Sequence, residues 1–315
     1  EDEGEYTKAL SLSRLAADLE SVASPVLAAV LLAFISYHNL FVGTALGFIL
    51  SAGFVVTAVL PKLSASQSLP FLRRLTGGVK LFALTPRLRG LLAISLATAA
   101  GGAMVFVNTV VLVQSNFGLS QQATAWALAA FGGGSMTAAV FLPKTLERVT
   151  DRSAMVSGAV LMTAVLIAGA LFARSYPVLI GLWIVMGFGY SLTITPAGRA
   201  LRRSSSAAER PALFAAQFAL SHACWLIAYP VAGLVSAEAN PQAAFVVLAG
   251  LCGLGALLAL VLWPAHDPLN LLHDHLDMEP DHAHLDEGMR PDAAGVAHAH
   301  PVMIDDNHRR WPKRR

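Results

Sequence analysis

The stretch "LLAISLATAAGGAMVFVNTVVLV", residues 91–113, is apolar from end to end and contains no Asp, Glu, Lys or Arg. About 20 apolar residues are enough for a helix to cross the hydrocarbon core of a bilayer. The whole chain has this character, because 55% of its 315 residues are hydrophobic and only 13% are charged. A soluble domain has about 25% charged residues. The sequence therefore predicts a helical membrane protein.

Eight apolar runs of this kind follow one another along the chain. They are residues 15–35, 40–60, 91–113, 122–142, 154–173, 178–195, 213–235 and 243–263. The first run is the exception to the rule against charge, because it contains Asp18 and Glu20. We expect an all-α polytopic membrane fold of eight transmembrane helices, with the lipid bilayer as the surrounding solvent.

The basic residues predict how the chain is oriented. Lys and Arg accumulate in the cytoplasmic loops of membrane proteins. Of the 22 basic residues, Arg174 alone falls on the other side of the membrane in this topology. We expect a multi-pass protein of the bacterial inner membrane with both termini of this chain in the cytoplasm. The membrane topology accounts for the basic residues, so we expect no nucleic-acid partner. We also expect the protein to be a monomer.

The runs divide the chain into four parts. Residues 1–60 hold the first two helices, 61–89 form a basic linker with a helical stretch from Phe71, 90–263 hold six helices, and 264–315 form a polar tail. The linker is expected either to lie at the lipid headgroups or to be a solvated basic loop. The tail has almost no apolar periodicity, so we expect it to be disordered.

A weak internal repeat relates the first hairpin to the last. When Pro25 is aligned with Pro230, Phe41 falls within one position of Phe245. Both hairpins enter from the same side, so the repeat is parallel, as in transporters built from two halves. If the halves match, four helices are missing before residue 1. This chain alone is then not expected to transport.

Six plus six helices around a basic linker resemble the major facilitator superfamily, and this chain resembles its helices five to twelve. The segments "YTKALSLSRLAADLESVASPVLAA", residues 6–29, and "LFVGTALGFILSAGFVV", residues 40–56, are similar to exporter-type bacterial members. Residues 214–233, "FAAQFALSHACWLIAYPVAG", resemble helix eleven of a proteobacterial group with His-rich tails. The resemblance implies the superfamily's fold and a secondary transporter, most simply a proton-coupled exporter of a small molecule.

Drug and proton antiporters of this superfamily carry a helix-five motif, G-x-x-x-G-P-x-x-G-G. The resemblance places Glu20, Ser24, Pro25, Ala28 and Ala29 on that motif. The small residues keep close helix approach, and the proline can bend the helix. Glu20 stands where the motif has its first glycine, which is a departure from the antiporter pattern.

The two acids of the first run have different predicted roles. Arg14 lies four residues before Asp18, so the two share a helix face and are expected to form a structural ion pair. Glu20 is rotated by about 200° from Asp18 and cannot share that partner. A carboxylate without a partner has a raised pKa, which makes Glu20 a candidate for proton coupling. The alternative is a structural bond to another helix.

Polar and aromatic residues near the middle of the other helices are the candidate substrate cavity: Asn108, Tyr190, His222, Trp225 and Tyr229. His222 and Trp225 are three residues apart and share a face. An imidazole and an indole on one cavity wall can hold a cation or an aromatic substrate. The alternative for His222 is a hydrogen bond between helices.

Two further patterns predict how the helices pack and gate. The glycines at 132–134, Gly187 and Gly189 predict close helix packing. Residues 143–154, "PKTLERVTDRSA", resemble the superfamily's G-x-x-x-D-R loop. The resemblance implies that Asp151 and Arg152 form charge pairs that gate one face of the transporter.

The tail contains eight of the ten histidines, and six of them form three His-x-His pairs. The pairs are His273/His275, His282/His284 and His298/His300. Such pairs suit Zn, Ni or Co, so the tail is expected to bind these ions weakly, although no resident cofactor is expected. Three alternatives stay open: a divalent-metal exporter with a metal-sensing tail, a metal buffer, and an inert tail.

An intramembrane enzyme is the third class of function. It requires a Ser-Lys pair, a paired Asp motif or a His-Glu-x-x-His sequence within the membrane. The eight runs contain none of these. We therefore predict a transporter and not an enzyme.

Overall fold

The computed structural model describes residues 27, 31, 34–35, 37–57, 71–206, 209–267, 271–274, 297–300, 304 and 311. Within this part of the chain, seven helices are long and apolar enough to cross a membrane. They correspond to seven of the eight predicted runs. The remaining run, 15–35, lies almost entirely outside the described residues. The prediction of an all-α polytopic fold is confirmed.

The elements begin and end where capping residues and prolines place them. In chain order they are α2 (Tyr37–Thr57), α3 (Phe71–Leu84), α4 (Pro86–Val110), the π-helix η1 (Val111–Asn116), α5 (Gln121–Thr145), α6 (Asp151–Phe172), α7 (Tyr176–Ile194), α8 (Ala197–Arg202), α9 (Arg210–Glu238), α10 (Pro241–Leu262), β1 (Leu271–Asp274) and β2 (Ala297–His300). Pro86 and Pro241 open their helices, where the missing N–H costs nothing. The Asn240 side chain accepts a 2.8 Å hydrogen bond from the Ala243 N–H and caps α10.

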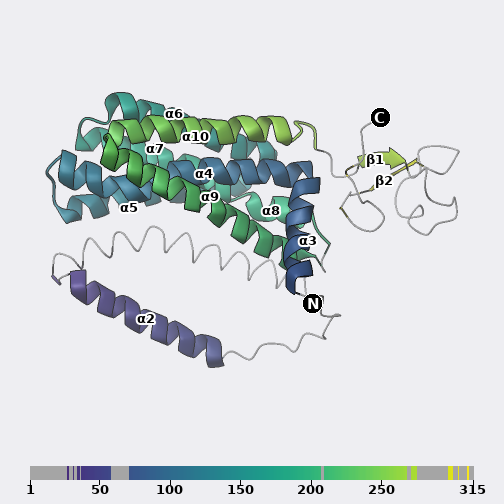
Figure 1. The fold of residues 1–315 in the computed structure, drawn as a ribbon, viewed down its shortest axis with the longest axis horizontal. Coiled ribbons are helices and arrows are strands. Elements are labelled where there is room, and N and C mark those ends of the chain that lie inside the picture. Colours follow the sequence, from purple (N-terminus) through teal and green to yellow (C-terminus); the bar gives the residue numbers. More distant parts are fainter. Residues whose placement is uncertain are drawn as a thin grey trace.

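The six long helices from α4 to α10 form one bundle, with α4 running through its middle (Figure 1). Helix α4 packs against α9 and α10, while α7 packs against α5 and α6. Helices α4, α6 and α9 begin, and α5, α7 and α10 end, at the same end of the bundle. We call this the basic end, because its charged residues include Arg87, Lys144, Arg152, Arg199 and Arg203.

Glycines allow the backbones of α5, α6 and α7 to touch. A Cβ atom at Gly134 would lie 1.9 Å from the carbonyl oxygen of Ile184, and one at Gly187 would lie 1.9 Å from that of Phe131. Gly158 of α6 likewise lies against the α7 backbone. Small residues at helix contacts are the usual means of close packing in membranes. The predicted packing role of Gly134 and Gly187 is confirmed.

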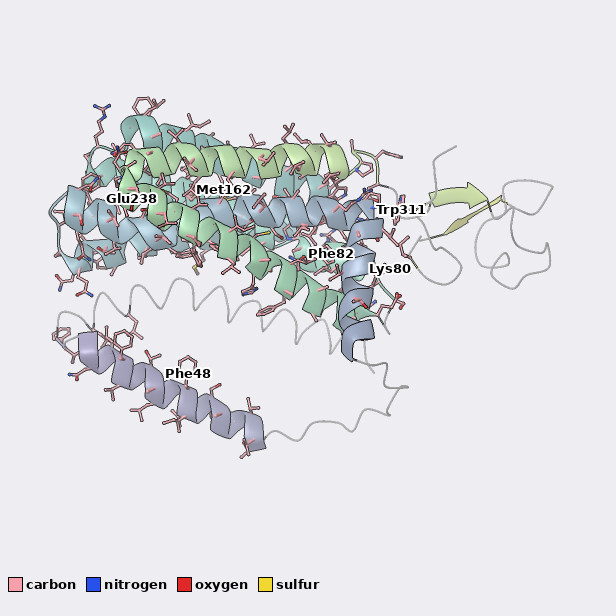
Figure 2. The ribbon with its side chains drawn as sticks, viewed as in Figure 1. Phe48, Lys80, Phe82, Met162, Glu238 and Trp311 are labelled. Carbon is pink, nitrogen blue, oxygen red and sulfur yellow. The ribbon has the colours of Figure 1, made fainter. Side chains whose placement is uncertain are left out.

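Helix α3 lies across the basic end of the bundle and packs against α9 (Figure 1). A Cβ atom at Gly78 would lie 2.5 Å from the carbonyl oxygen of Ala212 in α9. Leu81 and Phe82 are buried where α3 meets the bundle (Figure 2). The alternative prediction, that the linker is a solvated basic loop, is therefore wrong for residues 71–84, which form a helix. Helix α4 follows at once and begins at Pro86, slightly before the predicted start of the six-helix part.

Helix α2 lies apart from the bundle (Figure 1). Every residue from 41 to 57 is exposed, including Phe48, which Figure 2 shows on the separate helix. The helix with which α2 was expected to pair falls in residues 15–35, outside most of the described part. The parallel repeat therefore stays a prediction.

The tail has more structure than the sequence predicts. Strands β1 and β2 pair antiparallel, with Leu271 opposite His300 and His273 opposite His298. Ile304 is buried in the core cluster, and Trp311 packs against that cluster near the basic end (Figure 2). The expectation of a disordered tail is wrong for these residues, because a ladder satisfies their backbone and burial removes two apolar side chains from water.

Candidate functional site

Five aromatic rings from four helices of the bundle lie against one another and form what we call the aromatic cluster: Phe106 of α4, Phe131 of α5, Tyr190 of α7, and Trp225 and Tyr229 of α9. The ring centroids of Phe106 and Phe131 are 5.5 Å apart, and those of Phe131 and Tyr190 are 5.3 Å apart. Trp225 lies 6.0 Å from Phe106 and 4.9 Å from Tyr229. These are the separations at which aromatic rings attract one another.

Local sequence places the Trp225 ring of this cluster. A Cβ atom at Gly102 would lie 2.2 Å from the indole, so the missing side chain makes the space that Trp225 fills. Phe106 follows Gly102 by four residues, and Tyr229 follows Trp225 by four. Residues four apart lie on the same helix face. Gly102 and Phe106 thus share one face of α4, and Trp225 and Tyr229 share the face of α9 that packs against it.

Two rings of the cluster are exposed, and the helices that carry the cluster have no charged residues along most of their length. Phe106 is 47% exposed and Tyr229 is 41% exposed, whereas Phe131 is buried. Residues 90–143, 153–173, 175–198, 211–237 and 239–264 contain no Asp, Glu, Lys or Arg. Within the described residues, the hydroxyl groups of Tyr190 and Tyr229 have no hydrogen-bond partner. The site thus offers aromatic faces and two hydroxyl groups, without formal charge from these helices.

Three of the five predicted cavity residues, Tyr190, Trp225 and Tyr229, come together in this cluster. Asn108 does not, because it is fully buried and its Nδ2 donates a 3.2 Å hydrogen bond to the carbonyl oxygen of Ala232 in α9. It joins α4 to α9 and does not face the open side. The prediction that Asn108 lines the cavity is therefore not supported by its position.

His222 also lies apart from the ring contacts of the cluster. Its ring centroid is 3.9 Å from that of Phe218, and its Nδ1 is 2.7 Å from the Phe218 carbonyl oxygen, one turn back on the same helix. If Nδ1 carries the proton and donates to this carbonyl, Nε2 is an acceptor. His222 is exposed. Among the described residues, its hydrogen-bond partner lies on its own helix and not on a neighbouring one.

Sequence reasoning missed Phe106 and Phe131. Phenylalanine in an apolar run is the ordinary composition of a membrane helix, so neither residue type nor spacing separates these two from lipid-facing residues. The available signal was a small residue at a neighbouring helix contact. Gly102 makes room on α4 beside Trp225, and Gly187 lets α7 approach the Phe131 backbone.

The basic end contains a second group of interacting side chains. Asp151 is buried at the first turn of α6, with Arg199 Nε 3.3 Å from Oδ1 and Arg203 Nη1 3.8 Å from Oδ2. A carboxylate at a helix N-terminus is also favoured by the helix dipole. Asp151 therefore links the start of α6 to the segment that follows α7.

Arg152, the neighbour of Asp151, acts on a different helix. Its Nε donates a 2.6 Å hydrogen bond to the carbonyl oxygen of Trp263, and its Nη2 donates to that of Leu260 at 3.0 Å. These carbonyl groups lie at the end of α10, where the last helical turn lacks donors of its own. The predicted Asp-Arg pair thus joins α6 to two other helix ends. Its gating role stays a prediction.

A two-point ion pair at the basic end was not predicted. Arg87 at the start of α4 donates to both carboxylate oxygens of Asp267, from Nε at 2.6 Å and from Nη2 at 2.7 Å. Trp263 Nε1 donates to the same carboxylate at 3.2 Å. Arg87 Nη1 donates to the Arg203 carbonyl oxygen at 3.0 Å. The Arg87 side chain is 5% exposed, so this two-point pair is nearly dry.

Two opposing effects set the ionisation of Asp267. Burial alone would raise the pKa of its carboxyl group, but the hydrogen bonds and positive charge of Arg87 outweigh burial and lower the pKa below its ordinary value. Asp267 therefore stays ionised at neutral pH. It is a structural partner and not a group that exchanges protons near neutrality.

The remaining predicted site residues fall in or next to undescribed segments. Arg14, Asp18, Glu20, Ser24, Pro25, Ala28 and Ala29 lie outside the described residues, as do His275, His282 and His284. His273, His298 and His300 belong to the β1–β2 ladder. The residues searched for metal sites, which are described ones, include no group of three His, Cys, Asp or Glu side chains that could hold an ion.

Helices that are long and apolar enough to cross a membrane, packed into one bundle, define a polytopic membrane protein. The family model described as the Major Facilitator Superfamily matches residues 91–287, and the chain belongs to this superfamily. The family is one of secondary transporters, so the predictions of a transporter and of a non-enzyme are confirmed. No curated protein matches the chain.

Proposed function

We propose that the protein exports a small organic molecule by alternating access, in exchange for protons. The observation that carries this proposal is the aromatic cluster, in which rings from four helices meet and Phe106 and Tyr229 remain 47% and 41% exposed. A transported substrate needs a surface that binds it away from water and that one or other side of the membrane can reach. An exposed group of rings on apolar helices provides such a binding surface, and we propose that one side of the membrane can reach it.

Proton exchange requires an acidic side chain that can lose and regain its proton. The sequence of the transmembrane helices limits which residue this acid can be. Residues 90–143 and the later apolar runs contain no carboxylate. Glu20, in the first run, is then the candidate carrier, because the four-residue spacing predicts that Asp18 pairs with Arg14. A buried carboxyl group without a partner has a raised pKa and can exchange protons near neutrality. Its uptake of a proton would favour one of the two open states.

Orientation and gating complete the proposal. We place the basic end in the cytoplasm of a bacterial cell, because positive loops remain on that side of an inner membrane. Asp151 and its partners Arg199 and Arg203 then lie at the cytoplasmic face. We propose that this charge group helps to hold that face in one of its two arrangements.

The test uses inverted inner-membrane vesicles that contain the full-length protein. An acid-inside gradient is imposed, and its dissipation is followed as organic compounds are added. Glu20→Gln should abolish dissipation, whereas the matched control Asp18→Asn should retain it. Trp225→Ala should lower the apparent affinity for the compound. Proton exchange that survives Glu20→Gln would reject Glu20 as the carrier.

A divalent-metal exporter is the second candidate, and the register of the tail ladder favours it. His273 lies opposite His298, although 25 residues separate them in sequence. Opposite residues of an antiparallel ladder have Cβ atoms about 4.5–5.5 Å apart, a spacing compatible with two ligands for one ion. Against this candidate stands the lack of a three-ligand group among the residues searched for one.

The same vesicles distinguish the two candidates. Ni, Co or Zn ions should dissipate the gradient only if metal is the cargo. The tail's part is tested by changing the six tail histidines of the His-x-His pairs to alanine and leaving Asp267 in place, because Asp267 holds Arg87. Metal-driven dissipation that disappears in this variant would put the metal exporter first. Dissipation by organic compounds alone, unchanged in the variant, would make the tail accessory.

A further inference from the structure

We infer that His222 of α9 is a second proton-binding residue of this transporter, and that its protonation favours the arrangement in which its face of α9 is in contact with water. The inference concerns a residue other than Glu20 and rests on the proposed proton-coupled transport. It follows from the place of His222 on its helix, from the contacts of its ring, and from the scarcity of charge around it.

The sequence isolates His222 within the apolar helices. It is the single histidine in the stretches that contain no Asp, Glu, Lys or Arg, which are residues 90–143, 153–173, 175–198, 211–237 and 239–264. Imidazole is the side chain that ordinarily changes its charge between pH 5 and 8. The two cysteines of these stretches, Cys224 and Cys252, are buried. His222 is therefore the candidate in this part of the chain for a charge that changes near neutrality.

His222 shares a helix face with two rings of the aromatic cluster. It precedes Trp225 by three residues and Tyr229 by seven, which is one and two helical turns. Its side chain is exposed and makes no ring contact with either of them. A proton can thus reach the imidazole from water without displacing the rings of the cluster.

The contacts of the ring determine which nitrogen takes up the proton. Nδ1 lies 2.7 Å from the carbonyl oxygen of Phe218, and a carbonyl oxygen can only accept a hydrogen bond. The contact therefore favours the tautomer with Nδ1–H and a lone pair on Nε2. Among the described residues, Nε2 has no partner. The incoming proton bonds to the Nε2 lone pair, and the hydrogen bond from Nδ1 to Phe218 becomes charge-assisted.

Phe218 also accommodates the charged form of the ring. Its ring centroid is 3.9 Å from that of His222, and the two planes are inclined by 32°. The face of an aromatic ring attracts a cation. Ser221 Oγ donates a second hydrogen bond to the same Phe218 carbonyl oxygen, at 3.0 Å. The neutral and the protonated imidazole each have favourable contacts here, as a group that exchanges protons requires.

The charged imidazole has no counter-ion on the middle of the helices around it. Helix α9 packs against α3, α4, α8 and α10. Residues 241–262 of α10 contain no charged side chain. On the other elements and on α9 itself, the charged residues lie on α3 at the basic end, at the start of α4, on α8 and at the two ends of α9: Arg73, Arg74, Lys80, Arg87, Arg89, Arg199, Arg202, Arg210 and Glu238.

A charge without a counter-ion favours the more hydrated of two arrangements. Moving such a charge out of water is costly, whereas a neutral imidazole with its Nδ1–H bonded loses much less. Protonation of His222 therefore raises the population of the arrangement in which its face of α9 is hydrated. Loss of the proton from Nε2 lets this face leave water again.

The first test observes the protonation of His222 directly. The full-length protein is labelled with ¹⁵N in its histidine rings and placed in nanodiscs, and the spectrum of His222→Gln is subtracted. We expect Nδ1–H with a bare Nε2 at about pH 8.5 and two N–H groups at about pH 5. Ser221→Ala is the matched control, because it removes the other donor to the Phe218 carbonyl and should keep this titration.

The second test measures how the charge changes access of water to this face. Ala215 is exposed and lies two turns before His222, so Ala215→Cys reports hydration through its rate of alkylation by a charged, water-soluble maleimide at one fixed pH. In this background, His222→Lys keeps a positive charge and His222→Gln is neutral. We expect alkylation to be at least about threefold faster with Lys. The control Ala223→Lys puts the charge about 100° round the helix and should not accelerate it.

Four results would overturn the inference: an Nε2–H tautomer at high pH, no titration of His222 between these pH values, equal alkylation with Lys and Gln at residue 222, or equal acceleration by Ala223→Lys. Neither test needs a gradient or a cargo, so both are independent of the vesicle assay. Titration and alkylation as expected, without transport, would reject the proposed exporter and leave the proton site standing. Proton-coupled transport with a His222 that does not titrate would reject the inference and leave the exporter standing.

Discussion

Gly102 of α4 lies against the far edge of the indole of Trp225 in α9, so closely that a Cβ atom at residue 102 would be 2.2 Å from the ring atom Cη2. No side chain other than hydrogen fits that space without moving the indole. The same indole is 6.0 Å from Phe106 and 4.9 Å from Tyr229. One glycine on the central helix therefore sets the position of the ring that lies between Phe106 and Tyr229.

Replacing Gly102 by alanine should move this ring while leaving the fold intact. The new methyl group meets the far end of a side chain, which can rotate, and not backbone. We expect the apparent affinity for the exported compound in the vesicle assay to fall several-fold to about tenfold, approaching the loss in Trp225→Ala. The control is Gly133→Ala, because a Cβ atom at Gly133 meets nothing within 4 Å. Equal affinities in the two variants would contradict the proposed placement of Trp225.

Replacing Gly187 by valine should destabilise the bundle itself. A Cβ atom there lies 1.9 Å from the carbonyl oxygen of Phe131, so α5 and α7 would have to separate. Overpacking of this kind costs about 1–3 kcal/mol or more. Thermal unfolding in detergent measures the effect, with Gly181→Val on the same helix as the matched control, since a Cβ atom at Gly181 meets nothing within 4 Å. Equal midpoints for the two variants would show that the close contact is not needed.

Removal of Arg87 should cost more than removal of an ordinary surface arginine. Its bidentate pair with Asp267 is largely dry, with side-chain exposures of 5% and 15%. Breaking a buried pair from one side costs about 3–5 kcal/mol, because the remaining charge is left without its partner. We expect Arg87→Ala to lower the midpoint of thermal unfolding far more than Arg174→Ala, whose side chain is exposed in a loop.

A double-mutant cycle separates the pair from its surroundings. Arg87→Met with Asp267→Leu should recover much of the stability lost in either single variant, because no buried charge is then unpaired. Additive effects of the two changes would mean that Arg87 and Asp267 do not act as a pair.

The same pair predicts how stability depends on pH. The pKa of Asp267 lies below its ordinary value of 3.8 in the folded protein. A carboxyl group with a lowered folded pKa stabilises the protein above its unfolded pKa, and this contribution is lost as pH falls through the folded pKa. The stability difference between the wild type and Asp267→Asn should therefore be constant from about pH 5 to 8 and shrink only below about pH 4. A difference that shrinks near pH 6 would contradict the lowered pKa.

The membrane helices are the part of this fold that could be predicted most fully. Exclusion of charge over about 20 residues is a local property, because every residue of a span meets the same hydrocarbon solvent. Seven predicted runs accordingly became helices. The run that contains Glu20 lies almost entirely outside the described residues.

The aromatic site was predictable in part. Tyr190, Trp225 and Tyr229 are amphipathic residues in otherwise apolar runs, which made them visible in the sequence. Phe106 and Phe131 are not distinguishable by type, and their contacts span different helices. Asn108 was visible by type and belongs to a helix contact instead. The type of a residue thus indicated that it has a role within the membrane. It did not indicate which face of its helix, and which neighbouring helix, the side chain contacts.

The sequence by itself determined the membrane class, the number and order of most helices, and the glycines that let helices approach, because hydrophobicity and side-chain size act locally. Tertiary structure alone decided which rings meet, that Arg87 pairs with Asp267, and that Ile304 and Trp311 of the tail pack against the core. These contacts join residues far apart in the chain. Their geometry depends on how the helices are rotated against one another, which the pattern along a single helix does not specify.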